Sequence, residues 1–217
     1  MSGKKNILDF ICIGMEDQIR KWDDLYRTQK RAWRGVTNIG SVPFDEGSSV
    51  LELGCGNGKT LAALRDAGYR VTGVDFSQEA VNASRSLLGE DTDLRCASVL
   101  DLPFEDEYFD GVVMFHVLEH ITSEQERQAS SEIFRVMKPG SRLMLKSFSP
   151  GDMRSEKGER IDSSSVIRGN GILYKYRTED EIIEVFRDFK PESIRTVVED
   201  TRFGTQRSRI EAVFLKQ

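Results

Sequence analysis

The stretch that decides the fold reads Val50-Leu51-Glu52-Leu53-Gly54-Cys55-Gly56-Asn57-Gly58-Lys59-Thr60. It begins as a short apolar strand, continues with glycine at three alternate positions, and leads into the helical pattern that starts at Leu61. Glycine lets the backbone turn sharply and lets a ligand approach main-chain N–H groups. The stretch therefore predicts a nucleotide-type ligand site at the end of a first strand.

The glycine spacing narrows the choice of ligand. A dinucleotide site needs Gly-x-Gly-x-x-Gly, and Lys59 stands where the third glycine should be. A Walker-type phosphate loop also fails, because the span from Gly54 to Gly58 before Lys59 is too short. The spacing leaves a ligand that has a ribose and no pyrophosphate.

An acidic residue marks the end of the second predicted strand. Residues 70–74 form that strand, and Asp75 follows it directly. A carboxylate about 20 positions beyond the glycine turn accepts hydrogen bonds from ribose hydroxyls in nucleotide-binding folds. Asp75 is therefore the predicted ribose ligand.

Together these motifs resemble the class I S-adenosylmethionine-dependent methyltransferases, closest to the type 11 group, from about Ser48 to Lys146. The resemblance implies an enzyme that uses S-adenosyl-L-methionine, releases S-adenosyl-L-homocysteine and needs no metal. The family's adenine-binding acid falls at Ser98, which is not an acid, so its hydroxyl and the backbone of Val99 would have to make that contact. The residues that the resemblance places against the cofactor are Glu52, Gly54, Cys55, Gly56, Gly58, Asp75, Phe76, Ser77, Ser98, Val99 and Phe115.

Strand and helix patterns alternate along the chain, which predicts an α/β fold with a doubly wound, Rossmann-like, mostly parallel sheet. Lys138-Pro139-Gly140 is expected to separate the last core helix from the fifth strand. The resemblance implies seven strands that finish with a C-terminal antiparallel hairpin. The predicted elements are strand 49–53, helix 58–67, strand 70–74, helix 77–88, strand 93–97, strand 109–114, helix 123–137, strand 141–147, a helix after Thr178, and strands 193–198 and 210–215.

We expect one domain over residues 1–217, in three parts. Residues 1–45 carry aromatic and aliphatic side chains at helical spacing, which predicts an N-terminal helical cover. Residues 46–148 form the predicted cofactor-binding core. Residues 149–217 hold a connection over 149–171, rich in Gly, Ser and charge, and the end of the sheet. A connection of this length without elements of its own indicates a functional or mobile loop, such as a lid.

His116-Val117-Leu118-Glu119-His120 follows the fourth strand and matches the H-x-x-E-H pattern of some zinc peptidases. Zinc needs both histidines and a third ligand around one ion, and a segment opening from a buried parallel strand does not favour that arrangement. Two uses remain for His116: a general base for an oxygen or nitrogen acceptor, or a backbone partner at the strand end. The predicted acceptor pocket comprises Tyr26, Arg34, His116 and His120.

The composition bears on the binding partners and the location of the protein. The net charge is −5, with 38% hydrophobic and 31% charged residues, which argues against nucleic-acid binding through bulk charge. The three cysteines show no paired spacing, and no apolar run approaches the roughly 20 residues of a membrane span. We therefore expect a cytoplasmic enzyme without a membrane span; the composition leaves its oligomeric state open.

The acceptor is less well specified than the cofactor. The main prediction is in-line methyl transfer to an O, N, S or C atom of a small molecule. One alternative is a modified tRNA nucleoside or a protein, and a second is a non-catalytic adenosyl-cofactor-binding protein. Met114-Phe115-His116 stands where adenine methyltransferases carry Asn-Pro-Pro-Tyr, which argues against DNA methylation. Arginines that would form a basic edge for tRNA, but that are commonly solvated surface when scattered among acids, are Arg168, Arg177, Arg202, Arg207 and Arg209.

Overall fold

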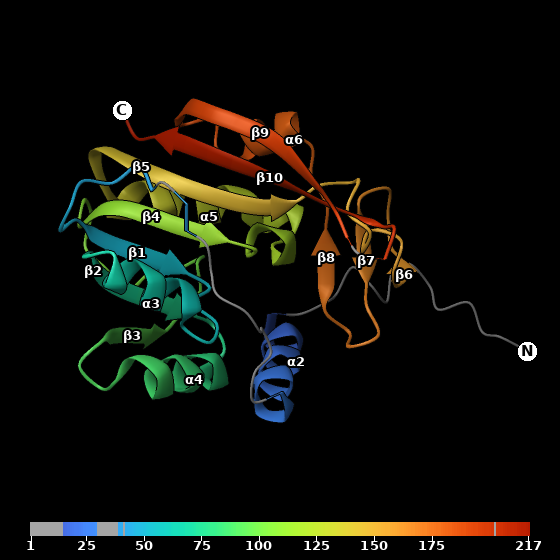
Figure 1. The fold of residues 1–217 in the computed structure, drawn as a ribbon, viewed down its shortest axis with the longest axis horizontal. Coiled ribbons are helices and arrows are strands. Elements are labelled where there is room, and N and C mark those ends of the chain that lie inside the picture. Colours follow the sequence, from blue (N-terminus) through green and yellow to red (C-terminus); the bar gives the residue numbers. More distant parts are fainter. Residues whose placement is uncertain (1–14, 30–38, 41, 202) are drawn as a thin grey trace, which may run out of the picture.

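The computed structural model describes residues 15–29, 39–40, 42–201 and 203–217. A seven-stranded sheet in the order β3-β2-β1-β4-β5-β10-β9 runs through the molecule (Figure 1). Neighbours from β3 to β5 are parallel, and β10 is antiparallel to both β5 and β9. The strands are β1 Ser49–Leu53, β2 Arg70–Asp75, β3 Asp93–Cys96, β4 Phe109–Phe115, β5 Met137–Phe148, β9 Lys190–Asp200 and β10 Gln206–Leu215. The predicted seven-stranded, mostly parallel sheet with its C-terminal hairpin is confirmed.

Helices pack on both faces of this sheet. The helix pair α3 and α4 contacts β2, and the pair α5 and α6 contacts β5 and β9. The central strands β1 and β4 are buried almost throughout, because parallel strands between two helical layers have no solvent face. The helices are α2 Met15–Thr28, α3 Lys59–Asp66, α4 Gln78–Leu88, the 3₁₀ turn η1 Leu118–His120, α5 Ser123–Val136 and α6 Glu179–Val185. Among the described residues, no helix is long and apolar enough to cross a membrane.

Two expectations about boundaries are corrected. Strand β5 begins at Met137, which pairs with Phe109, so Pro139 and Gly140 lie within an irregular start of the strand and do not precede it. The region 149–171 is not structureless. It carries β6 Glu159–Arg160 and β7 Ser165–Ile167, which form a small antiparallel sheet with β8 Leu173–Lys175. Short strands of two or three residues leave too little alternation in the sequence to be found there.

Helix α2 and the small sheet lie together beyond the carboxyl ends of β1 and β4 (Figure 1). Trp22 packs with Val166, Ile172, Tyr174 and Tyr176 in a buried cluster. The predicted helical cover is thus present over 15–28, while residues 1–14 and 30–38 are outside the described part of the chain. This arrangement leaves a covered space at the edge where parallel strands end.

Candidate active site

A cavity of about 930 Å³ lies at the carboxyl ends of β1, β2 and β4. Its walls also include residues of α2, β5, β8, β9 and β10. The strand order reverses between β1 and β4, and open α/β sheets bind ligands at such a switch point. The volume is within the range of cofactor and small-molecule sites.

The glycine turn forms one wall without side chains. Gly54 has a φ of 68° and Gly56 a φ of 55°, a region that disfavours other residues. A Cβ on Gly54 would lie 2.2 Å from Val117 Cγ2, and one on Gly56 would lie 2.7 Å from the Tyr26 hydroxyl. The backbone conformation favours glycine at both positions, and at Gly54 the contact with Val117 leaves no space for a side chain.

Asp75 is buried beside this turn. Its Oδ2 accepts a hydrogen bond from the Gly56 N–H at 2.9 Å, and its Oδ1 accepts one from the Ser77 N–H at 2.9 Å. Burial raises the pKa of Asp75 to about 6, although these backbone hydrogen bonds lower it in part. The carboxylate is therefore mainly ionised at pH 7, and each oxygen retains a lone pair for a ligand hydroxyl.

Glu52 is a second buried carboxylate on the wall. Burial raises its pKa well above the usual range, partly offset by hydrogen bonds with the Thr60 side chain and the Leu61 backbone. Its Oε2 is buried and has no hydrogen-bond partner in the described structure. A buried polar atom of this kind costs free energy unless a donor meets it, so the position suits a ligand amino group.

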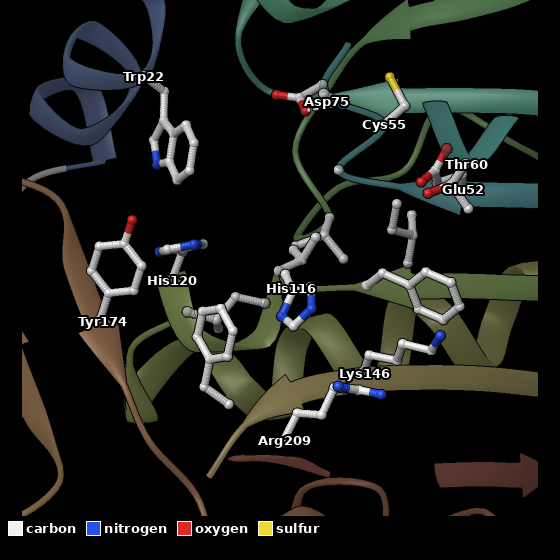
Figure 2. Close-up of a pocket in the computed structure, with 18 of the residues that line it drawn as sticks. Trp22, Glu52, Cys55, Thr60, Asp75, His116, His120, Lys146, Tyr174 and Arg209 are labelled. Carbon is white, nitrogen blue, oxygen red and sulfur yellow. Dashed lines mark hydrogen bonds between the residues drawn. The ribbon is translucent and has the colours of Figure 1, made fainter. Parts of the chain in front are cut away.

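His116 lies below these carboxylates in Figure 2, and it forms a hydrogen-bonded pair with Glu119. His116 has a positive φ of 59°, and its Nδ1 lies 2.9 Å from Glu119 Oε1. Ser147 Oγ donates to the other Glu119 oxygen at 3.3 Å. Burial alone would raise the pKa of Glu119, but the hydrogen bond and charge of His116 hold it below its usual range. The ionised carboxylate only accepts, so Nδ1 is the donor of this hydrogen bond, and the neutral form of the ring would carry its lone pair on Nε2.

Aromatic side chains line the opposite end of the cavity (Figure 2). The His120 ring lies 4.8 Å from Trp22 and 4.7 Å from Tyr174, both edge-on. Its Nδ1 hydrogen-bonds the Leu173 carbonyl at 2.7 Å, and burial lowers the pKa of His120, so the ring is neutral. Tyr26 stacks on Trp22 at 6.0 Å.

Helix α2 is held over the cavity at two points. Asp23 Oδ1 accepts from Ser77 Oγ at 2.5 Å, which ties the helix to the start of α4. Gln18 donates to the Gly171 carbonyl and accepts from the Leu173 N–H, each at 3.3 Å, which ties it to the turn before β8. The roof of the cavity is thus built from elements far apart in the sequence.

The structure brings most of the predicted site residues to this cavity. Ser98 is on the wall, and its hydroxyl accepts from the Leu100 N–H at 3.1 Å, so it also stabilises its own turn. Their contacts with a cofactor or acceptor stay predictions. The predicted residues that line the cavity are Tyr26, Glu52, Gly54, Cys55, Gly56, Asp75, Phe76, Ser98, Val99, Phe115, His116 and His120.

Two of the predicted cofactor residues are located elsewhere. A Cβ on Gly58 would meet Ser84 and Leu88 of α4, so this glycine serves the packing of α3 on α4. Ser77 is the N-cap of α4, where its hydroxyl accepts from the Ala80 N–H at 3.2 Å. Arg34, predicted for the acceptor pocket, and Arg202, predicted for the basic edge, lie outside the described residues.

The H-x-x-E-H segment does not build a zinc site in this structure. His116 faces Glu119, whereas the Nδ1 of His120 is taken by a backbone carbonyl. Over the described ranges, no group of three or more His, Cys, Asp or Glu side chains is placed to hold a metal ion.

Several wall residues were not predicted from the sequence. Trp22 lies in the predicted helical cover, where its helical spacing fits burial in the core equally well. Phe148 ends β5, and the rule that ligands bind at the carboxyl edge would have found it. No sequence signal marks Arg154, which lies in the connection before β6. Of the arginines expected at a basic edge, Arg207 and Arg209 line the cavity, whereas Arg177 is completely buried.

Comparisons with known proteins agree with this geometry. A family model described as a methyltransferase domain (Methyltransf_11) matches residues 51–145. The tRNA N(3)-methylcytidine methyltransferase trm140 of Schizosaccharomyces pombe is 26% identical over 65% of this chain and 51% of its own length. A demethylmenaquinone methyltransferase of Clavibacter sepedonicus is 34% identical over 54% of this chain and 47% of its own. This chain thus spans about half the length of these curated relatives.

A solved structure supports the fold over a larger share of the chain. A SAM-dependent methyltransferase from Methanosarcina mazei superposes with a TM-score of 0.69 at 23% identity, covering 82% of this chain and 99% of that one. The family model covers the glycine turn, Asp75 and the His116–Glu119 pair in one match. Residues 51–145 therefore match the methyltransferase domain of the type 11 family, and the chain has the fold of a class I S-adenosylmethionine-dependent methyltransferase.

Proposed function

We propose that this protein transfers a methyl group from S-adenosylmethionine to a nucleophilic atom of an acceptor bound in the 930 Å³ cavity. The observation that carries the proposal is that one cavity joins the glycine turn and Asp75 to the His116–Glu119 pair. The first group suits an adenosyl ligand, and the second suits proton removal from an acceptor. A protein that only binds the cofactor would have no use for the second group.

The residues on the wall fit the cofactor. Asp75 would accept hydrogen bonds from the ribose hydroxyls, and the unpartnered Oε2 of Glu52 would accept one from the amino group of the methionine part. The turn at Gly54 and Gly56 lines the cavity with backbone only, so its main-chain groups can approach that part closely. Ser98 would meet the adenine. When bound, the cofactor supplies a methyl group already activated by its sulfonium charge.

His116 would remove the proton of an N–H or O–H acceptor. Its Nε2 has the lone pair, and the ionised Glu119 behind Nδ1 fixes the tautomer and stabilises the imidazolium that forms. The positive φ of His116 is a strained conformation of the kind found at functional sites. The cavity walls orient the acceptor and exclude water, which lowers the barrier further.

For the acceptor, the comparisons lend more support to a tRNA nucleoside than to the free small molecule predicted from the sequence. The tRNA N(3)-methylcytidine methyltransferase covers more of this chain than the demethylmenaquinone methyltransferase does, 65% against 54%. We therefore propose a nucleoside in tRNA as the first acceptor to test. A small molecule is the second candidate, because α2 and β8 enclose the acceptor end of the cavity.

The test has two stages. Unfolding temperature is measured with S-adenosylmethionine, S-adenosylhomocysteine and NAD; a ligand at 100 times its Kd adds about 2.7 kcal/mol and should raise the midpoint by several degrees. Transfer of a tritiated methyl group is then measured onto total tRNA and onto a small-molecule extract. A shift with NAD alone would overturn the cofactor assignment, and binding without transfer to either pool would overturn the proposed activity.

A further inference from the structure

The acceptor end of the cavity has flat apolar walls. Trp22, Tyr26, Tyr174 and Phe148 all line it, and the Phe148 ring lies 4.4 Å from the ring of His116. Aromatic walls favour a planar guest that can stack or pack edge-on against them. The acceptor ring would then lie directly beside the proposed base.

Trp22 places a buried hydrogen-bond donor on this wall. Its indole is 7% exposed, and its Nε1–H has no acceptor in the described structure. Buried indole N–H groups usually find a partner, and leaving one unpaired costs free energy. A guest with an oxygen or ring-nitrogen acceptor at its edge would satisfy this donor.

The wall formed by β5, β9, β10 and the connection after β5 is cationic. Five cationic side chains and three carboxylates line this wall, which gives a formal excess of two positive charges. The carboxylates are Asp152, Glu199 and Glu211. Arg207 is exposed and forms no ion pair within the described chain, and Arg154 lies over the Phe148 ring at 4.7 Å from its centroid. The cations on this wall are Lys146, Arg154, Arg195, Arg207 and Arg209.

The charge is distributed unevenly along the cavity. The cofactor end carries Glu52 and Asp75, whereas the excess positive charge lies on the wall formed by β5, β9 and β10, where Figure 2 shows Lys146 and Arg209. Aromatic boxes also bind quaternary ammonium ions, but the cationic wall opposes a positively charged guest. An anionic acceptor would be attracted to the cationic wall. The carboxylates at the cofactor end would remain available to the positively charged cofactor.

From these two walls we propose that the acceptor is a planar ring with a hydrogen-bond acceptor at its edge for Trp22 Nε1 and a phosphate or carboxylate that meets Arg154 and Arg207. The proposal rests on the proposed function, because the guest must reach the methyl group beside His116. A nucleotide within RNA and a free aromatic acid share this chemistry.

The test uses paired probes and the protein saturated with S-adenosylhomocysteine. Calorimetry compares cytidine 5′-monophosphate with cytidine, and 4-hydroxybenzoate with 4-hydroxybenzyl alcohol. At least one anionic probe should bind at least tenfold tighter than its neutral partner, and added salt should reduce that difference. Equal affinity within both pairs, or no binding of either anion at 10 mM, would overturn the proposal.

Variants separate the ring from the anion. Trp22→Phe keeps an aromatic wall but removes the N–H, and should weaken the preferred anionic probe about tenfold. Arg154→Gln with Arg207→Gln should remove the preference for the anion and leave the neutral probe unchanged. Arg70→Gln, at the amino end of β2 and 74% exposed, is the matched control and should change neither. Unchanged binding by Trp22→Phe, or a retained preference in the arginine double variant, would overturn the proposal.

Binding of S-adenosylhomocysteine is measured first for every variant. If the unmodified protein does not bind S-adenosylhomocysteine, the proposed function is wrong. If it binds S-adenosylhomocysteine but shows no preference for an anionic probe, only this inference is wrong. A tRNA anticodon stem-loop that binds over tenfold tighter than cytidine 5′-monophosphate would assign the ring and anion to RNA. Equal or weaker stem-loop binding, with the anion preference intact, would assign them to a free small molecule.

Discussion

The two ends of the cavity are built in different ways. The cofactor end is made from two nearby stretches, where Asp75 is fixed by the backbone N–H groups of Gly56 and Ser77. The acceptor end is made from side chains of α2, β5, β8, β9 and β10, which meet only in the folded chain. A site fixed by local backbone geometry can be recognised from a short motif, whereas a site assembled from distant side chains can be recognised only in the folded chain.

The His116–Glu119 pair lies at the junction of the two ends, and its loss should have the largest effect. His116→Asn should reduce turnover by about 10²–10⁴-fold, since a positioned general base contributes that much. Asparagine tolerates a positive φ, so the backbone at this position should be retained. Steady-state methyl transfer, with the cofactor Kd measured separately, tests this.

His120→Asn is the matched control, because the Nδ1 of His120 is used in a hydrogen bond to the Leu173 carbonyl. It should leave the pH dependence of turnover unchanged, while Glu119→Gln should lower turnover by removing the carboxylate behind His116. Full activity in His116→Asn would show that the acceptor needs no base.

Breaking the frame of the acceptor end should come next. Arg177 is completely buried and donates to the carbonyls of Leu118 and Ile121 and to Glu126 at 2.7–2.8 Å. Arg177→Met should lower the free energy of unfolding by about 2–4 kcal/mol, because it leaves two buried carbonyls without a donor, whereas Glu126 keeps its ion pair with Lys175. Urea unfolding followed by circular dichroism measures this loss.

The exposed Arg187→Met is the control for that change. Its ion pair with Glu184 is 54% and 71% exposed, and it should shift the unfolding free energy by less than about 0.5 kcal/mol. Equal effects from the two variants would mean that the frame around η1 does not depend on Arg177.

The same contrast explains what could be predicted from the sequence. The glycine spacing and Asp75 predict the type of sheet, its switch point and the cofactor class. They can do so because a short motif of this spacing at the end of a strand is compatible with few backbone conformations. Trp22 could not be told from a core residue, since helical spacing reports burial and not the neighbour that buries it. Gly58 and Ser77 share the motif's pattern but serve helix packing and capping. Spacing identifies the turn without saying which of its residues face the ligand.

The pH dependence of Asp75 should have a smaller effect, confined to the cofactor end. Its folded pKa of about 6 lies above the ordinary 3.8, so its contribution to stability is complete below about pH 4 and lost as pH rises through 6. A shift of this size is equivalent to about 3 kcal/mol. Residue 75 does not titrate in Asp75→Asn. The unfolding free energy of this variant, measured relative to that of the unmodified protein, should therefore rise by about 3 kcal/mol between pH 4 and 7.

Cofactor binding should follow the opposite trend. Ionised Asp75 is the better acceptor for ribose hydroxyls, so affinity for S-adenosylhomocysteine should rise from pH 5 to 7 in the unmodified protein. The rise should be smaller in Asp75→Asn, where Glu52, whose pKa is also raised, still titrates. Affinity that is independent of pH in both would remove Asp75 from the ribose site.

The smallest predicted effect concerns Ser77, which belongs to the motif but not to the cavity wall. Ser77→Ala removes the N-cap of α4 and the hydrogen bond to Asp23, and should cost about 1 kcal/mol of stability. Ser77→Asn supplies another N-cap and should recover most of this loss. Cofactor affinity should stay unchanged in both, because Asp75 receives the backbone N–H of residue 77 and not its side chain. A tenfold loss of cofactor affinity in Ser77→Ala would contradict this prediction. It would show that the hydrogen bond between Ser77 and Asp23, which fixes the position of α2, is needed for cofactor binding.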